Sequence, residues 1–211
     1  MLRLIDQLGL VKRGDRVLDV GCGPGAMVSG LLDRAGREGS YVGFDVHRPS
    51  IEWCRRLYRG DSRCRFELAR LASPYATPGG GPVEGYSFPI DDGASDFVLA
   101  KSVFTHLEPG EARRYLVETR RALRPGCAAI VTAFLFDRAS DEFANVTLAF
   151  PFGDGQVRWR SWLRPNSAVA YEQSRFFELV GESGLRVQWM SAGYFPGAER
   201  LKGQDTLLLG L

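Results

Sequence analysis

The feature that most constrains the fold is an apolar segment that runs directly into a glycine-rich turn, Val17-Leu-Asp-Val-Gly-Cys-Gly-Pro-Gly25. Residues 16–20 are predicted to form a buried strand, and residues 26–35 follow with a helical pattern. Glycines let a ligand approach the backbone closely, and the start of a helix offers N–H groups that have no partner within the helix. We therefore expect a ligand-binding turn at the carboxyl end of the first strand.

Short apolar segments and helical patterns continue to alternate through the first two thirds of the chain, which is typical of a parallel α/β sheet. Further strands are expected at residues 41–44, 65–68, 96–100 and 128–136, and helices at 51–59 and 109–123. Ser50 is the expected N-cap of the helix at 51–59. A helix over 171–183 and strands at 186–190 and 206–211 are predicted to complete the sheet.

Two segments interrupt this alternation. Residues 73–85 hold three prolines and several glycines and are predicted to form a loop. Residues 137–169 are irregular and rich in aromatic side chains, and we interpret them as a substrate-facing insertion. Since no linker-like stretch is visible, residues 1–211 are expected to form a single domain.

Composition narrows the classes of function. The net charge of +2 argues against a nucleic-acid binder, which usually carries a strongly basic surface. No apolar run approaches the roughly 20 residues of a membrane span, and the amphipathic start does not read as a signal peptide. The four cysteines form no CxxC pair and only two histidines accompany them, so no metal site is expected. Scattered cysteines of this kind favour reduced thiols in the cytoplasm.

Two carboxylates define the expected ligand. The glycine spacing differs from the GxGxxG of a pyrophosphate-binding turn, and Asp19 at the end of the strand would repel a pyrophosphate but attract a cation. Asp45 ends the second strand about 20 residues later, where a carboxylate can accept both hydroxyls of a ribose. S-adenosylmethionine (SAM) combines a ribose with cationic groups. The alternatives are that Asp45 caps the following helix and that Asp19 braces the turn.

Four motifs together resemble the class I SAM-dependent methyltransferases: VLDVGCGPG, GFDV, the block from Phe88 to Val98, and Leu123-Arg-Pro-Gly126. The segments Ser102-Val-Phe-Thr-His106, Ala168-Val-Ala-Tyr171-Glu and Gly203-Gln-Asp205 are similar to a subgroup of small bacterial members. The resemblance implies a Rossmann-like, doubly wound sheet of seven strands in the order 3-2-1-4-5-7-6. Strand 7 would be antiparallel, and helices would cover both faces.

The resemblance also implies which residues bind the cofactor SAM. The turn residues Gly21, Cys22, Gly23 and Gly25 would contact its methionine and ribose parts, with Asp19, Asp45 and Val46 beside them. Lys101 and Ser102, after the fourth strand, would line the methionine and the methyl group, and Arg70 and Leu71 would read the adenine. Two positions depart from the pattern: Arg70 stands where an acceptor Asp is usual and cannot accept a hydrogen bond, and Lys101 stands where a small hydroxyl residue is usual.

The predicted function is transfer of the SAM methyl group to an O, N or C nucleophile of a small molecule, for example in secondary metabolism. His106 is the candidate general base; its alternative role is packing beside the adenosine or donating to a backbone carbonyl. A small-molecule acceptor is the expected partner, with no nucleic acid and no membrane. Two other classes stay open: a SAM-binding protein that does not methylate or serves as a partner subunit, and a nicotinamide-dependent oxidoreductase.

Overall fold

The computed structural model describes residues 1–76, 78–136, 150–193 and 203–211. These residues form two compact units. The first unit comprises residues 1–100 and 121–129, and the second comprises residues 101–120 and 130–211. In the part of the chain that is described, no helix has the length and apolar character needed to cross a membrane.

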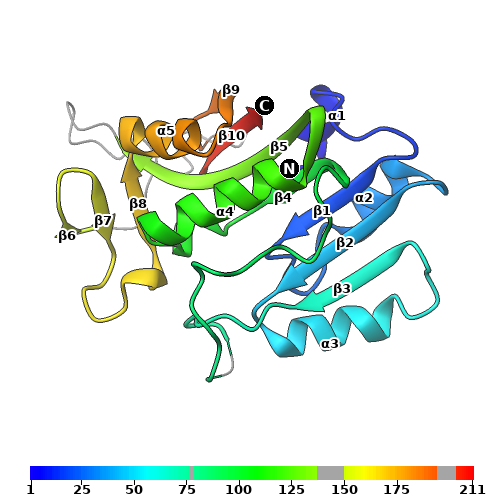
Figure 1. Cartoon of the computed structure of the whole chain (residues 1–211), viewed down its shortest axis with the longest axis horizontal. Helices are drawn as coiled ribbons and strands as arrows, with labels where there is room; N and C mark the ends of the chain where they lie inside the picture. The colour runs from blue at the N-terminus through cyan, green and yellow to red at the C-terminus, as the bar shows by residue number, and fades with distance from the viewer. Residues whose placement is uncertain (77, 137–149, 194–202) are drawn as a thin grey trace. The chain divides into compact units, whose positions relative to one another are not determined.

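The sheet of the first unit is parallel and follows the order β3-β2-β1-β4, with β5 next to β4 (Figure 1). Its strands are β1 (Arg16–Val20), β2 (Ser40–Asp45), β3 (Cys64–Leu68), β4 (Ser95–Ala100) and the start of β5 (Leu123–Phe136). The side chains of Val17, Leu18 and Val20 are almost completely buried. Such continuous apolar strands are typical of a parallel sheet that is covered on both faces.

Three helices belong to the first unit: α1 (Leu2–Gln7), α2 (Val28–Ala35) and α3 (Arg48–Leu57). α2 packs against β1 and β2, whereas α3 packs against β2 and β3. The predicted start of α3 was wrong, because the N-cap is His47 and Ser50 lies inside the first turn. Pro49 fits there because the first helical turn does not use its own N–H groups. The Ser50 hydroxyl instead lies 2.7 Å from Nδ1 of His47.

A loop connects β3 to β4, as the prolines and glycines of residues 73–85 predict. The structure assigns no helix to its described residues. Leu71 and Gly81 form an isolated parallel bridge, in which the Gly81 N–H donates to the Arg70 carbonyl at 3.0 Å. This bridge closes the loop immediately after β3.

The second unit continues from β5 in two directions. β10 (Asp205–Gly210) pairs with β5 and is antiparallel to β9 (Arg186–Ser191). The predicted order 3-2-1-4-5-7-6 is therefore confirmed, with β9 as strand 6 and β10 as strand 7. Three strands are additional: β8 (Val169–Glu172) is parallel to the end of β5, and β7 (Val157–Trp159) and β6 (Phe152–Gly153) follow as antiparallel strands.

The helical elements of the second unit are η1 (Phe104–His106), most of α4 (Pro109–Ala122), η2 (Pro165–Ser167) and α5 (Gln173–Glu182). α5 packs against β8 and β9. Glu172 caps it by accepting the Arg175 N–H, and Gly184 beyond its end has a φ of 80°. Of the insertion expected at 137–169, residues 137–149 lie outside the described residues, and the rest contains β6, β7 and η2.

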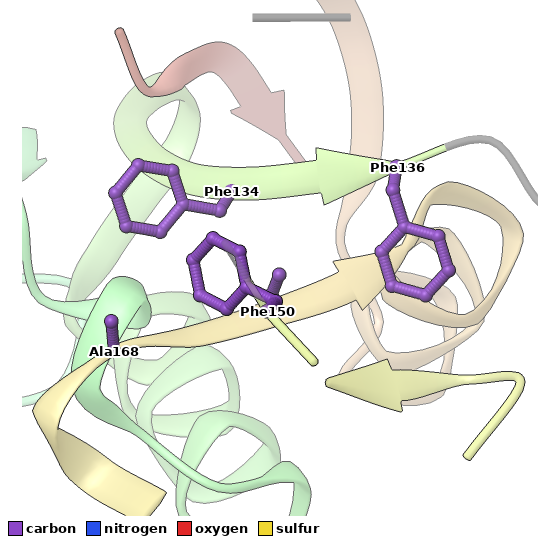
Figure 2. Packing of buried hydrophobic residues seen from close by; sticks show 5 residues of the cluster. Phe134, Phe136, Phe150 and Ala168 are labelled. Atoms are coloured by element: carbon purple, nitrogen blue, oxygen red, sulfur yellow. The ribbon is translucent and has the colours of Figure 1, made fainter. Parts of the chain in front are cut away.

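A compact apolar cluster joins β8 to the end of β5 (Figure 2). Its buried members are Phe134, Phe136, Phe150, Ala168 and Ala170. The rings of Phe134 and Phe150 lie 5.4 Å apart between centroids and are tilted by 56°. Aromatic pairs in this geometry add stability beyond the area they bury. β8 is therefore held to the end of β5 by its own core as well as by backbone pairing.

Candidate functional site

The glycine turn after β1 has a backbone that other residues rarely adopt. Gly21, Gly23 and Gly25 have φ values of 67°, 52° and 84°. A Cβ atom at Gly25 would lie 3.0 Å from Sγ of Cys54 and 3.2 Å from Cγ2 of Val28. The spacing Gly-x-Gly-x-Gly therefore reflects left-handed backbone at each glycine, with a close approach to α3 at the last one.

The Asp45 carboxylate lies against this turn. Its Oδ2 accepts the Gly23 N–H at 2.8 Å, and its Oδ1 accepts the His47 N–H at 2.8 Å. The alternative interpretation, that Asp45 caps the following helix, is wrong, because the N-cap of α3 is His47 and the N–H that Asp45 accepts at this end belongs to that residue. An ionised carboxylate has about four acceptor positions, so one remains on each oxygen. Asp45 is thus oriented by two N–H groups and retains the capacity to accept two hydroxyls.

Asp19 lies beneath the turn and is 2% exposed. Its Oδ2 accepts the Tyr41 hydroxyl at 2.6 Å. Burial first, and then the charge of Asp19, raises the pKa of Tyr41 well above its usual value of 10.0. Tyr41 therefore remains a hydroxyl donor to Asp19, and this contact joins β2 to β1.

The thiols of Cys22 and Cys54 lie beside the turn and close to both carboxylates. The Sγ atoms of Cys22 and Cys54 lie 3.7 and 3.6 Å from the Gly23 carbonyl oxygen. Burial, followed by the charges of Asp19 and Asp45, raises the pKa of both thiols. Both carboxylates thus disfavour additional negative charge at the turn, and by the same potential they favour a cation.

Val46, Arg70 and Leu71 line one cavity of about 130 Å³ in the first unit. The N-terminal end of α3 contributes Arg48 to its wall. The remaining lining residues come from the end of β3 and from the loop that follows: Leu68, Ala69, Ala76, Pro78, Gly79 and Gly80. The structure therefore brings together the three residues that the sequence placed near the ribose and the adenine.

The second unit contains the other predicted cofactor residues. Lys101 is exposed, and Ser102 has a φ of 60°. The Ser102 N–H donates to Oγ1 of Thr132 at 2.7 Å, and its hydroxyl donates to Oε1 of Gln204 at 2.9 Å. The polar contacts of Ser102 thus come from β5 and from the residue before β10.

The candidate base, His106, ends η1. Its Nδ1 lies 3.1 Å from the carbonyl oxygen of Asn166, which can only accept, so this nitrogen carries the proton. Asn166 also donates through Nδ2 to the His106 carbonyl at 3.1 Å. Burial lowers the pKa of His106 below its usual 6.5. The imidazole is therefore neutral at pH 7, and its Nδ1–H donates to a backbone carbonyl, which is the alternative role considered for His106.

Sequence reasoning missed several contacts of these residues. Tyr41, Asn166 and Gln204 each bond to a predicted site residue. Only Gln204 stood in a motif that could have revealed it, Gly203-Gln-Asp205. Among the residues that the structure describes, no three His, Cys, Asp or Glu side chains are grouped as metal ligands.

A family model described as a methyltransferase domain matches residues 17–126, which is more than half of the 211 residues. A probable methyltransferase from Aspergillus luteorubrus is 29% identical over 126 residues, which cover 56% of this chain and 40% of the relative. The chain spans less than half the length of the curated relatives that it matches.

Solved structures share the fold. A SAM-dependent methyltransferase from Mesorhizobium loti superposes with a TM-score of 0.69 at 15% identity, covering 99% of this chain and 94% of the other. The mitomycin 7-O-methyltransferase MmcR has a TM-score of 0.61 at 21% identity, covering 99% of this chain and 53% of that one. Because the family model covers the larger part of the sequence, the chain belongs to the class I SAM-dependent methyltransferases.

Proposed function

We propose that this protein binds SAM through the residues of the glycine turn and transfers the methyl group to a nucleophile on a small molecule. The observation that carries the proposal is the hydrogen bonding of the Asp45 carboxylate. Its two oxygens are oriented by the Gly23 and His47 N–H groups, each at 2.8 Å, and each retains one acceptor position. This is the arrangement that a ribose with two adjacent hydroxyls requires.

The charge of the turn supports a cationic ligand. Asp19 and Asp45 both raise the pKa of the neighbouring thiols of Cys22 and Cys54, after the larger effect of burial. The same potential favours a sulfonium or an ammonium group and opposes a pyrophosphate. It therefore argues against the nicotinamide-dependent alternative. Asp19 acts through its charge from beneath the turn, where Tyr41 holds it.

The cavity lined by Val46, Arg70 and Leu71 is the proposed adenine pocket. In the bridge that closes the loop after β3, Gly81 bonds to the residues on either side of Leu71. Gly81 therefore uses neither main-chain group of Leu71, and the Leu71 carbonyl oxygen, which lies beside Gly80, is the proposed acceptor for the adenine amino group. This offers a substitute for the acceptor side chain that Arg70 lacks.

When bound, SAM supplies an electrophilic methyl group on a positively charged sulfur. The chain's contribution is to orient the reactants and to manage one proton. Lys101 and Ser102 are assigned to the cofactor by the family resemblance. His106 is assigned as the base, supported by its neutral imidazole and by the tautomer that Asn166 fixes. A base is needed only where the acceptor nucleophile is protonated.

The acceptor is proposed to be a small molecule. The net charge of +2 offers little attraction to a nucleic acid. MmcR, which has the same fold, is a methyltransferase of mitomycin, and this likeness makes secondary metabolism a reasonable place to begin an acceptor screen. The insertion predicted at residues 137–169 of a single domain is proposed to face the acceptor; its residues 137–149 lie outside those that the structure describes. All four cysteines are free thiols, which suits the cytoplasm.

Calorimetric titration with SAM and with S-adenosylhomocysteine (SAH) tests the proposal. The wild-type protein is expected to bind both, and Asp45→Ala is expected to lose at least about tenfold in affinity because the ribose acceptor is removed. Asp91→Ala is the matched control, since it removes an exposed carboxylate of the same unit. Absence of binding by the wild type, or equal binding by Asp45→Ala, would refute the proposed site.

A second function, SAM binding without methyl transfer, is favoured by Arg70 in the cavity wall and by Lys101. A donor-only side chain gives the adenine amino group no acceptor, and a cation near the methyl donor opposes the sulfonium. Tight SAM binding with no methyl transfer across a broad acceptor panel would favour this alternative. Detection of a methylated product would exclude it.

A further inference from the structure

The backbone at Ser102 is strained. Its φ of 60° makes it the one residue other than glycine with a positive φ in the described part of the chain. A side chain disfavours this conformation, and such residues persist only where surrounding contacts hold them. Ser102 must therefore be stabilised by specific neighbours.

Three hydrogen bonds supply that stabilisation, and all lie within the second unit. The Ser102 N–H donates to Oγ1 of Thr132 at 2.7 Å, while the hydroxyls of Ser102 and Thr132 both donate to Oε1 of Gln204, at 2.9 and 2.5 Å. Thr132 is 3% exposed, so its hydroxyl proton requires a protein acceptor. One oxygen of Gln204 thus completes a closed ring of bonds around Ser102.

The residues on either side of Gln204 fix its position. The Asp205 carboxylate is 7% exposed and accepts the Leu135 N–H at 2.8 Å and the Gly193 N–H at 3.1 Å. Gly203 packs closely on Gly193. A Cβ atom added to Gly193 would lie only 2.3 Å from the Gly203 carbonyl oxygen. The contacts of Gly203 and Asp205 therefore anchor the motif on both sides of Gln204. Gln204 can then accept the hydroxyls of Ser102 and of Thr132 in β5.

We infer that Gln204 is a positioning residue that holds Ser102 in its left-handed conformation for cofactor binding. This inference rests on the proposed function, in which Ser102 contributes to the SAM site. Glutamine suits the role because its amide oxygen can accept two hydroxyl protons at once. Without it, both hydroxyls lose their acceptor and Ser102 is free to relax to an ordinary conformation.

The test uses the full chain, SAH as the probe, titration calorimetry for affinity and thermal unfolding for integrity. Gln204→Ala is expected to lower SAH affinity about tenfold. Gln204→Glu retains the acceptor oxygens and is expected to stay within about threefold of wild type. Ser102→Gly is the reference for the double variant, because glycine adopts a φ of 60° without strain and does not need Gln204 to hold that conformation.

The decisive variant combines Gln204→Ala with Ser102→Gly. If Gln204 acts through the conformation of Ser102, glycine at position 102 restores most of the affinity that Gln204→Ala loses. A double variant as weak as Gln204→Ala, or a Gln204→Ala protein with unchanged affinity, would overturn the inference. If Gln204→Ala unfolds, Gln204→Met is compared in the two backgrounds by the same criteria. A wild-type protein that does not bind SAH would instead refute the proposed function.

Discussion

At the residue scale, the groups that surround the proposed cofactor are fixed by short-range chemistry. Gly23 and His47 orient the Asp45 carboxylate through their N–H groups, and Tyr41 does the same for Asp19 through its hydroxyl. These partners leave Asp45 partly exposed and Asp19 buried. Two carboxylates near the same turn can therefore act differently, one by direct hydrogen bonds and one through its charge.

Gly25→Ala tests the close approach of the turn to α3. With a φ of 84° and only 3.0 Å to Sγ of Cys54, an added Cβ is expected to reduce the free energy of unfolding by about 1–2 kcal/mol and to weaken SAH binding. Urea denaturation and calorimetry measure the two effects. Gly60→Ala is the control, because nothing lies within 4 Å of its added Cβ. Equal stability of the two variants would contradict the steric argument.

His106 should make stability depend on pH. Burial lowers its pKa in the folded state below the usual 6.5, so the unfolded chain binds the proton more readily. Stability is therefore expected to fall as the pH decreases from 6.5 through the folded-state pKa. Urea denaturation at pH 7.5 and 5.0 should show a smaller pH difference for His106→Gln than for the wild type. A larger or unchanged difference would mean that His106 is not the group responsible.

At the scale of elements, the sequence located most helices and strands but misjudged where some begin. α3 starts at Arg48 and not at Ile51, because His47 and Pro49 together form an acceptable first turn. β5 starts at Leu123, ahead of the Pro125-Gly126 pair that was expected to precede the strand. Such boundaries depend on which backbone groups find partners, and the apolar pattern alone does not specify them.

Asp96 connects three strands of the first unit. Burial opposes its ionisation, but the hydrogen bonds from Arg16 and the charges of Arg16 and Arg124 outweigh burial and hold its pKa below the usual 3.8. The stability that ionised Asp96 adds to the folded state is thus fully present above pH 3.8 and is lost as the pH falls through the folded-state pKa. Asp96→Asn is expected to cost roughly 1–3 kcal/mol at pH 7 and less in acid.

Urea denaturation at pH 7 and pH 3 measures this difference. Asp92→Asn is a suitable control, because the carboxylate of Asp92 is 83% exposed in its pair with Arg121 and should contribute little. A loss for Asp96→Asn that is equally large at both pH values would show that the ion pairs are not its source.

Phe150→Ala tests the aromatic cluster that joins β8 to β5. Phe150 is 5% exposed and contacts Phe134, so its truncation is expected to cost about 3–5 kcal/mol in the free energy of unfolding. Phe152→Ala removes a ring that is 40% exposed two residues away and is expected to cost under about 1 kcal/mol. Similar losses for both variants would argue that the cluster does not stabilise the strand addition.

At the scale of the whole molecule, the chain consists of two compact units, and the residues assigned to the cofactor are distributed over both. The first unit contains the glycine turn, Asp45 and the proposed adenine cavity. The second contains Ser102, His106 and the motif around Gln204. Ligand binding can therefore report whether the two units unfold together.

SAH at about 100 times its dissociation constant should raise the free energy of unfolding by about 2.7 kcal/mol if the whole chain unfolds cooperatively. Differential scanning calorimetry with and without SAH measures this effect. A single transition that shifts upward indicates one cooperative chain. If two transitions occur and one keeps its midpoint, the corresponding unit neither binds SAH nor unfolds with the unit that does.

The glycine turn, the position of Asp45 at the end of the second strand and the strand order of the sheet were predictable from the sequence. The turn and its carboxylates depend on neighbouring residues, whose φ preferences and apolar pattern are local properties, and the strand order followed from the resemblance of several short motifs. The tertiary structure alone joined Gln204 to Ser102, Asn166 to His106 and β8 to β5. These pairs lie 102, 60 and 36 residues apart along the chain, where only the packing of the folded chain decides which side chains meet.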